Sequence, residues 1–209
     1  MRVMIVGSGD IAKAIAAAIS DHEIFHSDKL RGQILEESIR QVGASIMSTR
    51  PDVIINTVGS FAFDDEVIDQ RYFFDINFHF AFRLSNIFHD ICSDKDNWKY
   101  IFHITSDSAH IPRTNSALYC SSKAAVSMMI KCLARKWGKD KVCVSEIAPG
   151  AVDGTRMCGH IISRVGDFSE RTFIGRLVSP EEVGRLVSFL LNQGPSVNGQ
   201  QYILNGGWK

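Results

Sequence analysis

The chain has few cysteines, few prolines and no run of like charge. Its odd set of five cysteines contains no C-x-x-C spacing: Cys92, Cys120, Cys132, Cys143 and Cys158. This pattern favours free thiols in a reducing compartment over a disulfide framework. The 23 Lys and Arg residues balance the 23 Asp and Glu residues, which argues against an electrostatic nucleic-acid interface. No metal-ligand pattern is present, so we expect no bound metal.

Long hydrophobic runs are also missing. No apolar run is long enough to span a bilayer, and the first residues lead directly into a strand-like run, so we expect no signal peptide, no membrane partner and a cytoplasmic location. At 209 residues, the chain is long enough for one α/β domain with a sizeable core. It shows no internal repeat or linker, and we therefore expect a single domain over residues 1–209.

The first motif is a glycine turn between a strand and a helix. The apolar run Val3–Val6 is followed by Gly7-Ser8-Gly9-Asp10-Ile11-Ala12 and then by an alanine-rich stretch with high helix propensity. Strand, Gly-x-Gly-x-x-Ala and helix is the pattern of a dinucleotide-binding turn, in which backbone N–H groups at the start of the helix contact a pyrophosphate. A plain tight turn is the alternative.

A tyrosine and a lysine lie four residues apart at the start of a helical run. Tyr119 and Lys123 therefore share one face of a helix, and the positive charge should lower the pKa of the phenol, so that the pair can exchange a proton. Ser106 lies thirteen residues before Tyr119, at the end of the strand-like run Tyr100–Ile104. Without an adjacent base, Ser106 is interpreted as a hydrogen-bond donor rather than a nucleophile.

Four further motifs accompany this pair in a fixed order: Asn56-x-x-Gly59, Asn77 inside an apolar helical stretch, Pro149-Gly150, and Asn205-Gly206-Gly207. Together with the glycine turn and the Ser-Tyr-Lys set, they resemble the short-chain dehydrogenase/reductase family over nearly the whole chain. The resemblance implies a Rossmann-like, doubly wound, mostly parallel sheet with helices on both faces. Residues 29–50 are too few for the family's helix, strand and helix, so we expect one helix and a lost or vestigial third strand.

The resemblance also implies catalytic roles. Tyr119 would exchange the proton with the substrate oxygen, and Ser106 would hold that oxygen. Lys123 would lower the Tyr119 pKa and bind the ribose hydroxyls. Asn77 would open its helix locally and hold a water that links to Lys123. His103, which alternates with apolar strand residues, is interpreted as structural.

NAD or NADP is the implied cofactor. The residues expected to contact it, besides Tyr119 and Lys123, are Gly7, Ser8, Gly9, Asp10, Ile11, Asp28, Asn56, Gly59, Pro149, Gly150, Val152 and Thr155. Asp28 should favour the ribose 2′-hydroxyl of NAD, and the adjacent Lys29 a 2′-phosphate, so NAD is only slightly favoured. Thr155 would contact the nicotinamide carboxamide, although Gly154 displaces it by one position from the family spacing.

The implied function is hydride transfer between NAD(P)(H) and a small carbonyl or alcohol. The aromatic helical stretch Asp65–Ile91 and the apolar helix after Tyr119 favour a homo-oligomer, either a dimer or a tetramer. Two alternatives stay open. A sugar-nucleotide epimerase or dehydratase of the same superfold usually carries a larger C-terminal domain, and a non-catalytic nucleotide sensor has no need for the Ser-Tyr-Lys set.

Overall fold

The strands form one parallel sheet. The computed structural model describes residues 1–27 and 35–208. The strand order is β2-β1-β3-β4-β5-β6, and every neighbouring pair is parallel. The strands are β1 Arg2–Val6, β2 Glu23–Ser27, β3 Val53–Asn56, β4 Lys99–Ile104, β5 Val142–Pro149 and β6 Gln201–Leu204. β3 and β5 are buried along their whole length, as expected where helices cover both faces of a sheet.

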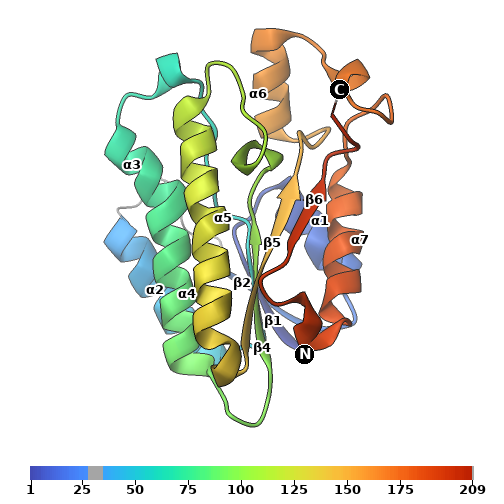
Figure 1. Cartoon of the computed structure of the whole chain (residues 1–209). Helices are drawn as coiled ribbons and strands as arrows, with labels where there is room; N and C mark the ends of the chain where they lie inside the picture. The colour runs from blue at the N-terminus through green and yellow to red at the C-terminus, as the bar shows by residue number, and fades with distance from the viewer. Residues whose placement is uncertain (28–34, 209) are drawn as a thin grey trace.

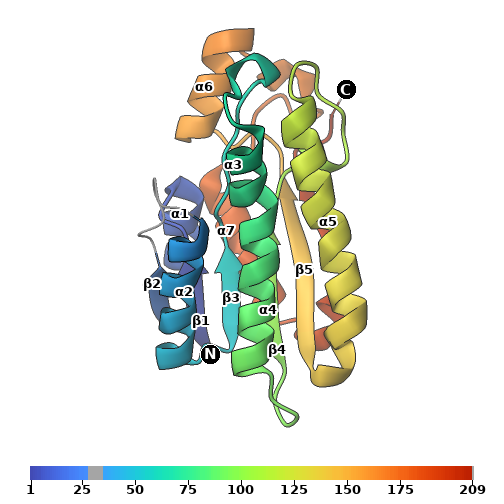
Figure 2. The ribbon, with the colours of Figure 1, turned by 90° about the vertical axis from the view of Figure 1, so that its left-hand side faces the viewer.

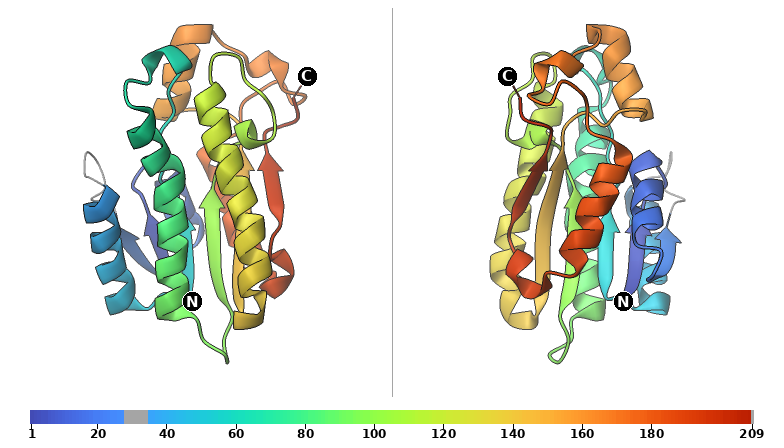
Figure 3. Two further views of the ribbon diagram at one scale, coloured as in Figure 1. Left: turned by 60° about the vertical axis from the view of Figure 1, so that its left-hand side comes forward. Right: turned by 90° about the vertical axis from the view of Figure 1, so that its right-hand side faces the viewer.

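Helices pack on both faces of this sheet (Figures 1 and 2). α2 Leu35–Thr49, α4 Phe80–Cys92 and α5 Ala117–Trp137 cover one face. α1 Asp10–Ala18 and α7 Pro180–Leu191 cover the other, as the two views of Figure 3 show. α3 Gln70–Phe74 and α6 Arg156–Val165 lie toward the carboxyl ends of the strands. None of the helices in the described part of the chain is long and apolar enough to cross a membrane.

Two hydrophobic clusters hold the layers together, because successive residues of a strand point to opposite faces. In β1, Met4 and Val6 pack with α2, α4 and α5, whereas Val3 and Ile5 pack with α1 and α7. α1 and α7 approach closely at Gly184, where a Cβ atom would lie 2.7 Å from the carbonyl oxygen of Ala14. The predicted doubly wound fold is therefore confirmed.

The shortened region is also confirmed. In the residues described between β2 and β3, α2 is the one regular element, and its buried residues are Ser38, Ile39, Val42 and Ile46. β2 therefore forms one edge of the sheet beside β1. Asp28 and Lys29, which were expected to select the cofactor, lie outside the described residues.

The expected helix over Asp65–Ile91 is wrong at its start. Asp64–Glu66 forms a single 3₁₀ turn, and α3 begins only at Gln70, where the Asp69 side chain caps it by accepting from the Tyr72 N–H (3.1 Å). The intervening residues Val67 and Ile68 leave the helical path because the Asp69 cap sets a new helix start. A π-helical turn, Asp75–His79, then separates α3 from α4.

Candidate active site

The predicted site residues gather at the carboxyl ends of four neighbouring strands. The turn Gly7–Ile11 follows β1, and Gly59 follows β3. Ser106 follows β4, and Gly150 follows β5. The chain order reverses between β1 and β3, and ligands of open α/β sheets bind at such a point.

The glycine turn is packed against Thr57 at Gly7 and is open at Gly9. Gly7 has φ +114°, and a Cβ atom there would collide with the Thr57 hydroxyl, which donates to the Val6 carbonyl (3.0 Å). Thr57 thus supports the turn, a role that the sequence did not reveal. Gly9 is the N-cap of α1, carries no side-chain cap, and has no described atom within 4 Å of its Cβ position. The free N–H groups of this helix start fit a pyrophosphate group.

The Asn56 side chain belongs to a closed hydrogen-bond chain. Its Oδ1 accepts from the Val58 N–H (3.1 Å), so its Nδ2 donates to His103 Nδ1 (3.1 Å). His103 Nε2 then donates to Ser85 Oγ (2.9 Å), which donates to the Ala81 carbonyl (2.8 Å). Burial, and then the charge of Lys123, lower the pKa of His103 to about 3. The structural interpretation of His103 is confirmed.

Tyr119 and Lys123 lie in the first turns of α5, and each is only 4% exposed. The Lys123 Nζ atom lies 5.7 Å from the centroid of the Tyr119 ring. Burial raises the pKa of Tyr119 to about 12, although a hydrogen bond with Ser106 opposes this shift. The pKa of this phenol is therefore raised and not lowered in this structure, because burial outweighs the hydrogen bond with Ser106, and the lowering expected from Lys123 stays a prediction. Tyr119 is a protonated phenol at neutral pH.

Lys123 is a buried ammonium group without a hydrogen-bond acceptor among the described residues. Burial lowers its pKa to about 8, and the negative charge of Glu146 opposes this shift. Its Nζ atom lies against Gly59, where a Cβ atom would be 2.7 Å from it. An unpartnered buried cation is costly, and ribose hydroxyl groups would provide the missing acceptors. The residues present therefore fit a nicotinamide cofactor.

Asn77 lies in the π-helical turn, so the predicted local opening of the helix is confirmed. Its side chain holds the segment that follows β3. Asn77 Oδ1 accepts from the Ser60 N–H (2.8 Å), and its Nδ2 donates to the Ser60 carbonyl (2.9 Å). The wider turn thus places Asn77 beside the glycine against which Lys123 lies.

Ser106 is extended and buried at the end of β4, where its Oγ accepts from the Ser108 N–H (3.2 Å). Next to it, the Asp107 carboxylate accepts from Arg113 (2.7 Å) and Asn205 (3.2 Å). The Arg113 guanidinium also stacks 4.0 Å from the Trp208 ring centroid. These contacts of Asp107 and Arg113, which we call the clasp, tie the C-terminal segment to the loop that begins at Ser106. The sequence did not predict them.

Beyond β5, Gly150 is required by a close approach, because a Cβ atom there would lie 2.9 Å from the Cβ atom of Asn205. Thr155 is the N-cap of α6: its hydroxyl accepts from the Cys158 N–H (3.2 Å) and donates to the Val152 carbonyl (2.7 Å). Pro149 and Val152 are buried. The contacts expected of these residues with the cofactor stay predictions.

Aromatic rings surround the Tyr119 ring. Phe61 makes an edge contact with it at 4.9 Å, and Phe73 lies at 6.5 Å between centroids. His160 of α6 lies 6.3 Å from the Phe61 ring, and it contacts Glu66 (3.0 Å). These contacts hold α6 against an aromatic wall formed by Phe61, Phe73 and His160. No spacing in the sequence indicated the wall, since its members come from three separate segments.

Comparison with known proteins decides the family. The family described as enoyl-(acyl carrier protein) reductase matches residues 3–209. The chain belongs to the short-chain dehydrogenase/reductase family. It is 26% identical to the 7alpha-hydroxysteroid dehydrogenase of Escherichia coli, over 96% of this chain and 84% of the relative.

Solved structures share the fold of this short-chain dehydrogenase/reductase. A short chain dehydrogenase family protein of Francisella tularensis superposes with a TM-score of 0.84 at 20% identity, covering 98% of this chain and 97% of the other. An actinorhodin polyketide ketoreductase with NADPH also gives a TM-score of 0.84, at 19% identity and with coverages of 98% and 95%. The chain is thus an oxidoreductase of an NAD(P)-dependent family.

Proposed function

We propose that this oxidoreductase transfers hydride between NAD(P)(H) and a small carbonyl or alcohol, with Tyr119, Ser106 and Lys123 as its catalytic residues. The observation that carries the proposal is the buried ammonium of Lys123, which has no acceptor among the described residues, one helical turn from a phenol that hydrogen-bonds with Ser106. A purely structural core would leave no cation in this state.

In the reducing direction, the carbonyl carbon gains a hydride and the oxygen gains a proton. The nicotinamide supplies the hydride when the cofactor is bound. Tyr119 donates its proton to the substrate oxygen, and the high pKa of the phenol keeps this proton in place at neutral pH. Ser106 donates a hydrogen bond to the same oxygen as negative charge develops there. Lys123 binds the ribose hydroxyls, and Asn77 completes a path through water that returns a proton to Tyr119.

We propose the cofactor-binding residues on the basis of the same arrangement. Gly7, Ser8, Gly9, Asp10 and Ile11 hold the pyrophosphate at the open start of α1. The ribose and the nicotinamide lie against a second set of residues: Asn56, Gly59, Tyr119, Lys123, Pro149, Gly150, Val152 and Thr155. The choice between NAD and NADP, which was expected to depend on Asp28 and Lys29, stays a prediction because both residues lie outside the described part of the chain.

The walls of the site suit an uncharged, largely apolar carbonyl compound. Phe61 and Phe73 face Tyr119, and the nearby Arg164 is already paired with Asp65 (2.8 Å) and Glu66 (3.1 Å). An anionic substrate would therefore have to compete with these carboxylates for the guanidinium.

We also propose a homo-oligomer, a dimer or a tetramer. Tyr72, Phe82 and Met128 expose between 41% and 59% of their surface on α3, α4 and α5, and a second copy of the chain packed on these helices would cover them. Sedimentation at micromolar concentration tests this, and a single 23.3 kDa species would contradict it.

Absorbance of the reduced nicotinamide tests the activity. The purified protein is mixed with NADH or NADPH and a panel of aliphatic and aromatic ketones, and consumption of the cofactor is followed. Ser106→Ala should lose turnover while retaining cofactor binding, and Ser48→Ala, an exposed change on α2, is the matched control. Cofactor binding with no turnover on any member of the panel would favour the nucleotide sensor instead.

A further inference from the structure

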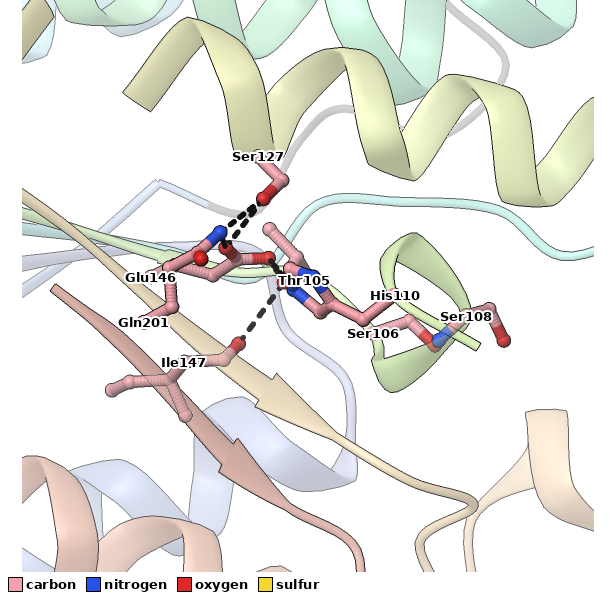
Figure 4. A network of polar contacts seen from close by, with 8 residues as sticks. All are labelled: Thr105, Ser106, Ser108, His110, Ser127, Glu146, Ile147 and Gln201. Carbon is pink, nitrogen blue, oxygen red and sulfur yellow. Dashed lines mark hydrogen bonds and ion pairs between the residues drawn. The ribbon is translucent and has the colours of Figure 1, made fainter. Parts of the chain in front are cut away.

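A carboxylate is buried in the middle of β5, behind the candidate active site. Glu146 is fully inaccessible to solvent, although its neighbours along the strand are apolar or small. Figure 4 shows the polar side chains of Thr105, His110, Ser127 and Gln201 around it. Its Oε1 accepts from Thr105 Oγ1 (2.5 Å) and contacts His110 Nε2 (3.3 Å). Its Oε2 accepts from Ser127 Oγ (2.8 Å) and Gln201 Nε2 (2.6 Å).

Three of these four partners belong to the segments that carry Ser106, Tyr119 and Lys123. Thr105 immediately precedes Ser106, and His110 ends the 3₁₀ turn that follows it. Ser127 lies four residues after Lys123, on the same face of α5. Gln201 begins β6 and also donates to Ser127 Oγ. One side chain thus ties the Ser106 loop to the helix of Tyr119 and Lys123.

The carboxylate also supplies charge. Lys123 has no acceptor of its own among the described residues, and the negative charge of Glu146 counteracts the effect of burial on the Lys123 pKa. The other titratable groups around Lys123 act differently. Tyr119 is a neutral phenol, and His103 is a neutral imidazole on β4. Asp107, beyond Tyr119, is paired with Arg113, and His110 is bound to Glu146 itself.

We propose that Glu146 is a positioning residue for hydride transfer: it fixes Ser106 relative to Tyr119 and keeps Lys123 charged for the ribose. This inference rests on the proposed function. It extends that function to a residue that does not touch the substrate or the cofactor. The charge and the length of the Glu146 side chain can be tested separately. Glutamine keeps the shape without the charge, and aspartate keeps the charge with a shorter side chain.

The experiment measures two pH profiles for wild type, Glu146→Gln and Glu146→Asp. One is the affinity for NADH or NADPH by fluorescence without substrate, and the other is kcat on a ketone that the wild type reduces. In Glu146→Gln, Lys123 should lose its proton at lower pH, so the alkaline limb of both profiles should move down by about one pH unit. Glu146→Asp should keep the alkaline limb near that of the wild type and lose kcat through poorer positioning.

Glu181→Gln, an exposed change on α7, is the matched control and should leave both profiles unchanged. Circular dichroism and thermal unfolding establish that each variant is folded. If Glu146→Gln shows the wild-type alkaline limbs, or if Glu146→Asp shifts them equally, the inference is overturned while the proposed function stands. A wild-type protein that neither binds the cofactor nor reduces any ketone would overturn the proposed function, and this inference with it.

Discussion

His103 and Lys123 are two buried, ionisable side chains that differ in what surrounds them. Both ring nitrogens of His103 have partners, in Asn56 and Ser85, and the imidazole is neutral. The Lys123 ammonium is equally buried, yet it has no acceptor within the part of the chain that the structure describes.

The difference separates a group that stabilises the fold from one arranged for a ligand. A buried polar group with all partners present contributes to stability, and its loss leaves other groups unpaired. A buried charge without partners destabilises the free protein, and a ligand that supplies acceptors recovers this free energy when it binds. The same contrast holds for glycines, since the space at Gly9 is open and the space at Gly184 is filled.

The largest effect should come from Tyr119→Phe, which removes the phenolic hydroxyl group and keeps the ring. A positioned general acid contributes roughly 10²–10⁴-fold to the rate, so kcat should fall by about that factor while the dissociation constant of the cofactor hardly changes. Tyr100→Phe, on β4, is the matched control and should keep its kcat. Near-normal turnover of Tyr119→Phe on any accepted substrate would contradict the proposed role of Tyr119 as the proton donor.

The next effect concerns His103, whose two ring nitrogens both have hydrogen-bond partners. His103→Ala should lower the free energy of unfolding by about 3 kcal/mol, because Asn56 and Ser85 lose their buried partner. Urea unfolding measures this loss, with the exposed His26→Ala as the control.

The sign of the pH dependence sharpens this test. The folded-state pKa of His103, about 3, lies below its ordinary value of 6.5, so its contribution to stability is complete above pH 6.5 and declines as the pH falls toward 3. Acid unfolding of His103→Ala should therefore depend less on pH in this window than that of the wild type. An equal dependence would mean that His103 is not the neutral group described.

Lys123→Met should do the opposite and raise the free energy of unfolding by about 1–3 kcal/mol, because it removes a buried charge that has no acceptor in the described part of the chain. Its folded-state pKa, about 8, lies below the ordinary 10.5, so the wild type should recover stability relative to the variant between pH 8 and 10.5. Lys131→Met, exposed on the same helix, is the control. Thermal unfolding across pH measures the difference. A destabilised Lys123→Met would mean that this lysine stabilises the fold and is not arranged for a ligand.

The smallest effect should come from Gly9→Ala. No described atom lies near the added methyl group, so stability should change little, but the methyl would stand where the pyrophosphate is proposed to bind. We expect cofactor affinity to fall about tenfold, or ~1.4 kcal/mol. Gly184→Ala should instead destabilise the fold, because its methyl group would meet the backbone of α1. Unchanged affinity in Gly9→Ala would move the phosphate site elsewhere.

Local patterns were enough to predict much of this arrangement. The i, i+4 spacing placed Tyr119 and Lys123 together, and the helical spacing of residues 34–46 predicted α2. The raised Tyr119 pKa could not be predicted, since its burial depends on side chains from distant segments, such as Phe61 and Phe73. Likewise, the clasp of Asp107 with Arg113 and Asn205 joins the chain's middle to its end.

One signal for the Glu146 network was visible in the sequence. A glutamate inside the apolar run Val142–Ala148 is unusual, because a buried carboxylate needs several donors. The run itself does not reveal the donors. They come from the residue before Ser106, from the loop after it, from α5 and from β6, and only the strand order brings these segments together.

The shortened region has a consequence for how molecules of this protein meet one another. With β2 at the rim of the sheet, one row of backbone N–H and C=O groups has no neighbouring strand in the described chain, and such a row is a template for aggregation. β2 counters this by being short and by carrying Glu23, which is 62% exposed and forms an ion pair with Arg2. The charge at this rim discourages two sheets from joining edge to edge, a protection that an additional strand would otherwise have to provide.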